Sequence, residues 1–143
     1  MTIAAVLAGR GAAQIVTITT DATVGEAVAL LAKRGIGAVP VMDGATVAGI
    51  FSERDVLREL ARQGADALDR PVSTVMTTPA ITVSRDQAVI GALSLMTHRR
   101  IRHLPVVEAG QLVGLVSIGD LVKYRIDRIE ADAAAMRAYI QSA

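Results

Sequence analysis

An internal repeat, offset by 65 residues, is the feature that most limits what this chain can fold into. Residues 14–57 align without a gap to residues 79–122, and 12 of these 44 positions are identical. Most of the other positions exchange one apolar residue for another. Two copies are too few for a solenoid. The repeat therefore predicts two similar halves that pack about a pseudo-twofold axis.

Each repeat has the pattern strand, helix, strand, strand, helix. In the first repeat, residues 14–19, 38–42 and 47–51 are apolar and rich in β-branched side chains, which is typical of strands. Thr23 and Glu26 form a Thr-x-x-Glu capping box that predicts a helix start, and Gly35 and Gly37 end that helix. Asp43-Gly44 predicts a hairpin turn between the second and third strands.

The last helix of the first repeat is predicted to run from Ser52 to Gln63, with Gly64 closing it. The order βαββα predicts an α/β (α+β) fold with two small three-stranded sheets, each covered by helices. Thr2 is the expected N-cap of a short N-terminal helix. We divide the chain into a first repeat with that helix (1–63), a connector (64–78), a second repeat (79–122) and a C-terminal helical extension (123–143).

Composition excludes several classes of protein. A hydrophobic content of 52% is too high for an intrinsically disordered chain. The absence of cysteine excludes disulfide scaffolds, thiol nucleophiles and Cys-ligated metal sites, and it fits a reducing, cytoplasmic location. A net charge of +1 and only three aromatic residues argue against nucleic-acid binding, and no apolar run is long enough to span a membrane.

The C-terminal helix carries a heptad pattern of apolar residues. Their spacing is 4, 3, 4, 3, 4, and the positions are Val122, Ile126, Ile129, Ala133, Met136 and Ile140. One interpretation is a helix laid back on its own domain. The other is a helix that packs against a second chain, which the narrow apolar stripe favours.

The sequence Ser-x-x-Asp follows the third strand of both repeats, at Ser52–Asp55 and Ser117–Asp120. One interpretation is a helix cap, although we expect aspartate to be too short for the usual capping box, in which glutamate or glutamine is preferred at that position. The other is a nucleotide site, in which the aspartate accepts hydrogen bonds from ribose hydroxyls and the serine and helix amides meet a phosphate.

A basic cluster, residues 98–103, precedes the second strand of the second repeat. Arg99 and Arg100 suit a helix C-terminus, where cations complement the helix dipole. Arg102 and His103 lie in the approach to a buried strand and replace Gly37 and Ala38 of the first repeat, so they indicate a phosphate-binding position. A nucleic-acid patch is the alternative interpretation of this cluster.

Support for catalysis is weak. The sequence has no Gly-x-Ser-x-Gly elbow, no His-Glu-x-x-His motif and no phosphate-binding loop of the Gly-x-x-x-x-Gly-Lys-Ser/Thr type. Its two histidines have no partner at metal-ligand spacing. We therefore predict neither an enzyme nor a metal site.

These residues resemble a tandem pair of CBS domains, known as a Bateman module, of the stand-alone bacterial type. The resemblance rests on Gly49-Ile-Phe-Ser-Glu-Arg-Asp55, on Arg102-His-Leu-Pro-Val-Val107 and on Gly114-Leu-Val-Ser-Ile-Gly-Asp120. It covers nearly the whole chain. It implies two clefts that bind adenosyl ligands such as AMP, ADP, ATP, NAD or S-adenosylmethionine, with no obligatory cofactor, and a module that forms homodimers.

The resemblance also implies roles for single residues. Asp55 and Asp120 would hold ribose, and Ser52 and Ser117 would approach phosphate. The other implied ligand residues are apolar side chains around adenine and basic side chains near phosphate: Ile15, Val16, Ala80, Ile81, Arg54, Arg102 and His103. Gly37-Ala38 departs from the basic pattern, which argues against equal occupancy of the two clefts.

The function implied is a regulatory module that senses a nucleotide and modulates a partner protein in trans, with no nucleic acid or membrane involved. The rival is an interaction protein without a ligand, in which both Ser-x-x-Asp motifs are only helix caps.

Overall fold

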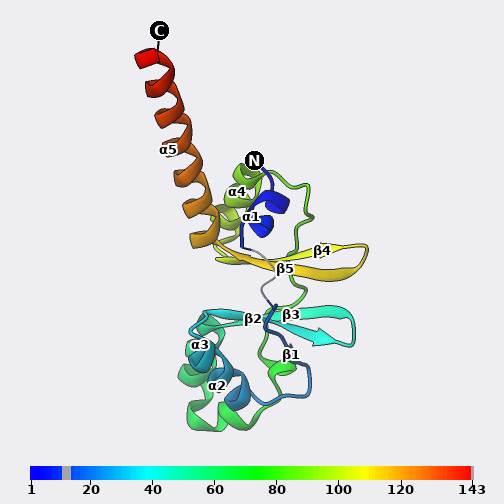
Figure 1. Ribbon diagram of the computed structural model, residues 1–143. Coiled ribbons are helices and arrows are strands. Elements are labelled where there is room, and N and C mark those ends of the chain that lie inside the picture. Colours follow the sequence, from blue (N-terminus) through cyan, green and yellow to red (C-terminus); the bar gives the residue numbers. More distant parts are fainter. Residues whose placement is uncertain (11–13, 143) are drawn as a thin grey trace. The chain divides into compact units, whose positions relative to one another are not determined.

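The elements follow the repeat closely in the computed structural model, which describes residues 1–10 and 14–142 (Figure 1). The first repeat contains β1 (Ile18–Thr19), α2 (Val24–Arg34), β2 (Ala38–Asp43), β3 (Thr46–Ser52) and α3 (Glu53–Gln63). The second contains α4 (Val89–Arg99), β4 (His103–Glu108), β5 (Gln111–Ser117) and α5 (Ile118–Ser142). The short helix α1 (Ile3–Ala8) precedes them, and the 3-10 helices η1 (Gly64–Asp69) and η2 (Val72–Thr74) lie in the connector.

The helix ends form where capping chemistry predicts them. The Thr23 hydroxyl accepts a hydrogen bond from the Glu26 amide at 3.1 Å, and Gly35 ends α2 in the left-handed conformation with φ 62°. The expected N-cap of α1 is also confirmed, because the Thr2 hydroxyl accepts from the Ala5 amide at 3.4 Å. Capping signals therefore located three helix ends of this chain correctly.

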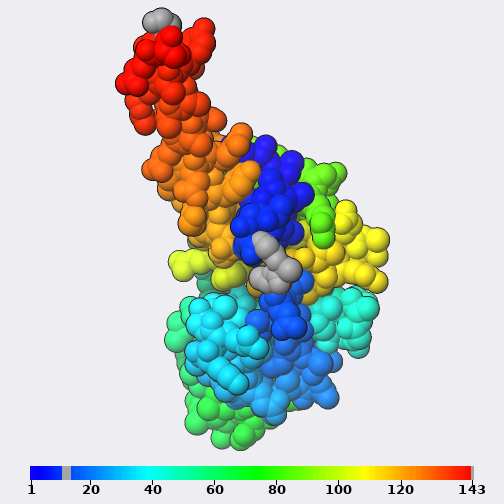
Figure 2. All heavy atoms as spheres, viewed as in Figure 1, coloured from blue at the N-terminus to red at the C-terminus, as the bar shows by residue number. Residues whose placement is uncertain are grey.

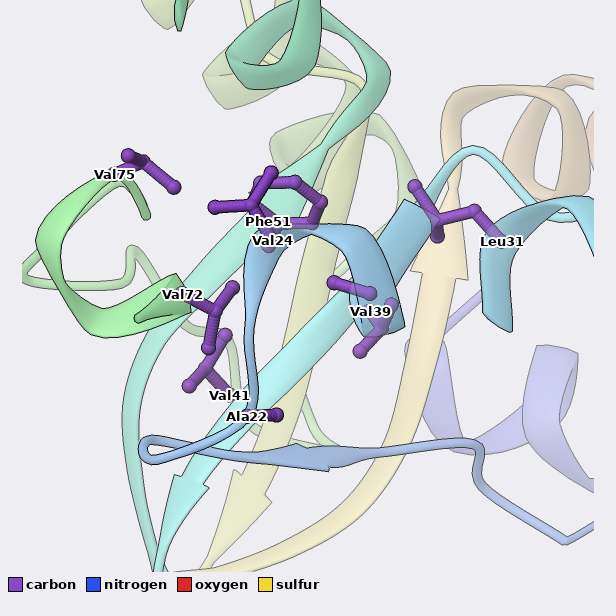
Figure 3. Close-up of a cluster of buried hydrophobic side chains, with 9 residues drawn as sticks. Ala22, Val24, Leu31, Val39, Val41, Phe51, Val72 and Val75 are labelled. Atoms are coloured by element: carbon purple, nitrogen blue, oxygen red, sulfur yellow. The ribbon is translucent and has the colours of Figure 1, made fainter. Parts of the chain in front are cut away.

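The chain divides into two compact units. One holds Gln14–Thr82 and Pro105–Leu115, and its sheet has the strand order β1-β2-β3. Strand β1 is parallel to β2, with Ile18 beside Val41, and β2 is antiparallel to β3. Buried side chains from β2, β3, α2 and η2 form the core of this unit, among them Phe51, Val39 and Val72, which are fully buried (Figure 3).

The other unit holds Met1–Ala13, Val83–Leu104 and Val116–Ala143. Here the structure differs from our grouping of the N-terminal helix with the first repeat. The Ile3 amide donates to the Gln87 carbonyl oxygen at 2.9 Å, and the Ala4 amide donates to that of Arg85 at 2.8 Å. Because Ile3 is also fully buried, α1 belongs to the unit that carries α4 and α5.

The strands differ from the expectation in one respect. Within the described residues, the second sheet contains β4 and β5, and no strand is assigned to residues 79–84, where the repeat predicted one. Val83, which aligns with Ile18 of β1, forms only a single-residue bridge. Only the last residues of the expected first strand, Ile18 and Thr19, pair with β2.

Candidate functional site

The first Ser-x-x-Asp motif forms the turn between β3 and α3. Ser52 is the N-cap of α3, with φ −132° and ψ 167°. Its amide donates to Asp55 Oδ2 at 2.9 Å, and its hydroxyl donates to the same oxygen at 3.1 Å. The expectation that aspartate is too short for a capping box was therefore wrong, because the extended N-cap backbone brings the serine amide within its reach.

Asp55 is almost completely buried, with 3% of its surface exposed. Its second oxygen, Oδ1, accepts a hydrogen bond from the Thr77 hydroxyl at 3.1 Å and lies 3.6 Å from Arg58 Nη1. Both carboxylate oxygens therefore have partners within the chain, as a buried carboxylate requires. Because the side chain is also buried, little of this carboxylate is accessible to a ribose.

The second motif is built in the same way but is more open. The Ser117 amide donates to Asp120 Oδ2 at 2.7 Å, and the Asp120 amide donates to Ser117 Oγ at 3.1 Å. The Asp120 side chain is 38% exposed, and Arg10 forms an ion pair with the same Oδ2. The hydrogen bond from Ser117 and the ion pair with Arg10 therefore meet at one oxygen of this carboxylate.

One backbone hydrogen bond connects the basic cluster to the second motif. The Ile118 amide, at the start of α5, donates to the Arg102 carbonyl oxygen at 2.8 Å. The equivalent bond in the first repeat joins the Glu53 amide to the Gly37 carbonyl oxygen at 3.0 Å. The repeat therefore holds the same backbone position next to each motif, but only the second repeat places a cation there.

The other residues of the basic cluster are neighbours of Arg102 in the sequence. His103 begins β4 and is half-buried, whereas Arg102 is exposed. Arg100 ends α4 in the left-handed conformation, with φ 55°, where the first repeat has Gly35. Within one unit, the structure therefore brings together Ser117, Asp120, Arg102 and His103.

The remaining predicted ligand residues lie in the other unit. Ile15 and Val16 are half-buried in the irregular segment before β1. Ala80 and Ile81 are half-buried in the segment that follows the cis Thr78–Pro79 peptide bond. Arg54 is exposed on the first turn of α3.

Thr77 and Arg10, which contact the two aspartates, were not predicted from the sequence. Thr77 reaches Asp55 because residues 76–77 lie against β3, where Ile50 and Thr77 exchange backbone hydrogen bonds of 3.0 and 2.8 Å. Gly49 permits this approach, since a Cβ atom there would be 2.7 Å from the Thr77 carbonyl oxygen. The glycine that precedes the motif was the available sequence signal for Thr77. Arg10 had no such signal.

Among residues 1–10 and 14–142, no cluster of three or more histidine and acidic side chains is arranged to hold a metal ion. In that part of the chain, no helix is both long and apolar enough to cross a membrane.

Comparison with known proteins identifies the family. The family model described as CBS domain matches residues 12–62 and 72–127. The chain therefore belongs to the CBS-domain family, and it contains a tandem pair of these domains with a C-terminal helix.

Individual relatives agree with this assignment. The mitochondrial CBS domain-containing protein CBSX3 of Arabidopsis thaliana is 38% identical over 86% of this chain, which spans 62% of that relative. YhcV of Bacillus subtilis is 32% identical over 85% of this chain and 86% of its own length. The relatives are named as CBS domain-containing proteins, and neither name states a reaction.

Solved structures support the fold. The CBS-domain containing protein ATU1752 of Agrobacterium tumefaciens superposes with a TM-score of 0.83, at 39% identity over 87% of this chain and 99% of that one. CBSX2, solved in complex with AMP, superposes with a TM-score of 0.69, at 26% identity over 80% of this chain and 89% of that one.

Proposed function

We propose that this protein is a regulatory module that binds an adenosine-containing ligand at the Ser117–Asp120 motif. Asp120 would accept hydrogen bonds from the ribose hydroxyls through its partly exposed carboxylate, while Ser117 and the helix amides approach the phosphate. Arg102 and His103 would supply positive charge to the phosphate. The observation that carries the proposal is the Ile118–Arg102 backbone hydrogen bond, which holds this cationic segment beside the motif.

The AMP complex of CBSX2 supports the ligand class, since that protein shares the fold of this chain. AMP, ADP, ATP, NAD and S-adenosylmethionine all carry the adenosine group that the motif would recognise. Ile15, Val16, Ala80 and Ile81, which lie in the unit of the first motif, are proposed as apolar contacts of an adenine ring because the family resemblance implies that role. The first motif, with Ser52, Asp55 and Arg54, is the weaker site, because both oxygens of Asp55 already have partners.

Regulation would follow from differential affinity. A ligand that binds one arrangement of the two repeats more tightly shifts the protein toward that arrangement. We propose that a cytoplasmic homodimer transmits this shift to a partner protein in trans, and that the module has no catalytic activity of its own.

Isothermal titration calorimetry with the five candidate ligands tests the proposal. We expect at least one of them to bind, and we expect Asp120→Ala to lose that binding. Asp55→Asn is the matched comparison, because it changes the equivalent residue. This variant should retain the tighter site and lose stability by roughly 1–3 kcal/mol, since it disrupts a buried, hydrogen-bonded carboxylate. A folded parent that binds none of the five at millimolar concentration would refute the proposal.

The second candidate function is an interaction protein without a ligand. It is favoured by one observation, namely that both Ser-x-x-Asp motifs form capping boxes and so have a complete structural explanation. The same titration separates the two candidates. Binding that is equal in the parent and in Asp120→Ala would refute our assignment of the ribose and leave these motifs as caps.

A further inference from the structure

Helix α5 presents two different faces. Its first turns pack on their own unit through Leu121, which is fully buried, and through the half-buried Tyr124 and Arg125. Every described residue from Ile126 onward is exposed. Figure 1 shows this part of α5 extending past α1 and α4, and in Figure 2 its red end stands clear of α1.

The predicted heptad residues lie on the face that does not pack on the unit. Their exposed fractions include 42% for Val122, 49% for Ile126, 56% for Ile129, 60% for Met136 and 66% for Ile140. The interpretation of α5 as a helix laid back on its own domain is therefore wrong for this face. A helix with an exposed apolar stripe is marginal in water unless another surface covers the stripe.

We propose that the heptad face of α5 pairs with α5 of a second copy as a parallel, in-register coiled coil. The argument comes from the charged residues that flank the stripe. In a parallel coiled coil, a residue at heptad position g faces the residue at position e of the partner, which is five positions later in the sequence. Ile126 and Ala133 occupy position a, so Arg125 and Asp132 occupy position g. Arg125 then faces Glu130 of the partner subunit, and Asp132 faces Arg137 of the partner subunit. Both contacts join opposite charges, and the twofold symmetry repeats each of them.

The antiparallel arrangement with full overlap of the stripe has the opposite charge pattern. Asp132 would then face Asp132 of the partner subunit, and Glu130 would face Glu130 of the partner subunit. Lys123 would face Arg137 of the partner subunit. All three contacts join like charges, which disfavours this arrangement.

Antiparallel pairs shifted by one heptad bring opposite charges together, but they cover less of the stripe. A shift toward the helix tip leaves Val122 and Ile126 uncovered, and a shift toward the helix start leaves Met136 and Ile140 uncovered. The parallel arrangement is therefore the one that covers all six apolar residues and also matches the charges. Lys123 does not need a partner across the pair, because its ammonium donates to Asp127 of the same helix at 2.7 Å, a hydrogen bond that raises the pKa of Lys123.

Charge exchange in the full chain tests the orientation. Arg125→Glu and Glu130→Arg each place like charges across the parallel pair, so each should weaken the dimer about tenfold. The double variant restores opposite charges and should restore the parent dimerisation constant, measured by sedimentation equilibrium. Mixing the two single variants should yield heterodimers, since each then faces its complement.

In every antiparallel arrangement, the double variant remains no better than the single variants. A parent that stays monomeric at all accessible concentrations, or a double variant without rescue, would overturn the proposal. Arg125 is half-buried and Glu130 is exposed, so these substitutions should leave the fold intact.

Disulfide cross-linking gives a second readout, because the chain contains no cysteine. Ile140→Cys should cross-link under mild oxidation, since residue 140 meets its own copy in the parallel pair. In any antiparallel pair considered above, the two copies of residue 140 are at least about 16 Å apart along the axis. Ala138→Cys, on the outward face, is the matched control and should not cross-link. A dimeric sample in which Ile140→Cys fails to cross-link would also contradict the proposal.

Discussion

Arg100 has a backbone conformation that arginine rarely adopts. Its φ of 55° is left-handed, and the equivalent residue of the first repeat, Gly35, has φ 62°. A residue with a Cβ atom is disfavoured in this conformation, whereas glycine is not. Because the left-handed arginine lies in the basic cluster beside Arg102, its positive charge is a reason for the protein to tolerate the strain.

Replacing Arg100 with glycine tests this view. We expect Arg100→Gly to increase the free energy of unfolding by roughly 0.5–1 kcal/mol, because it relieves the left-handed backbone. The same variant should bind a phosphate-bearing adenosyl ligand less tightly than the parent does. Chemical denaturation measures the first effect, and calorimetry measures the second. Gly35→Ala is the control and should lower stability, since it introduces the same strain in the first repeat.

At the scale of elements, the contact between β3 and residues 76–77 brings Thr77 to the Asp55 carboxylate of the first motif. A Cβ atom at position 49, which glycine lacks, would lie 2.7 Å from both the Thr77 carbonyl oxygen and the Met76 sulfur. A larger residue there must push the segment away from the strand. The hydrogen bond from Thr77 to Asp55 depends on this close approach.

We therefore expect Gly49→Ala to lower the free energy of unfolding by roughly 1–3 kcal/mol, as overpacking does elsewhere. Thermal unfolding followed by circular dichroism provides the measurement. Gly9→Ala is a suitable control, because its nearest atoms would be at 3.6 Å and its backbone is right-handed, so its stability should stay close to that of the parent. Equal stability of Gly49→Ala and the parent would show that the segment can move freely.

At the scale of the whole molecule, ligand binding and stability are linked. A ligand that binds only the folded protein stabilises it by roughly 2.7 kcal/mol at 100 times its dissociation constant. We expect a binding nucleotide to raise the unfolding temperature of the parent, with a smaller or absent shift for Asp120→Ala. A shift of equal size in both proteins would locate the binding away from Asp120.

The sequence predicted most helices and their ends, because capping residues and glycines act locally. Thr23, Gly35, Ser52 and Gly64 mark helix ends that the structure confirms. The hairpin turn predicted at Asp43-Gly44 was also correct, since Gly44 follows β2 and has a positive φ. The two Ser-x-x-Asp motifs were predicted as candidate sites, and the sequence could not rank their exposure.

The sequence pattern did not predict contacts between segments that are distant in the chain. The packing of α1 on the second repeat depends on backbone hydrogen bonds to residues 85 and 87, which carry no distinctive side-chain signal. The ion pair of Arg10 with Asp120 follows from that packing. Residues 83–84 show the limit of the repeat itself, since they align with β1 but form only a single-residue bridge at Val83.

Gly37 and Arg102 accept equivalent backbone hydrogen bonds, one in each repeat. The first repeat can therefore be compared directly with the second. Because the bond uses only main-chain atoms, the side chain at that position can change without disturbing the helix start. Gene duplication could therefore leave the scaffold of one copy intact while the other acquired charge. The first repeat shows the same backbone contact with a glycine in place of the arginine.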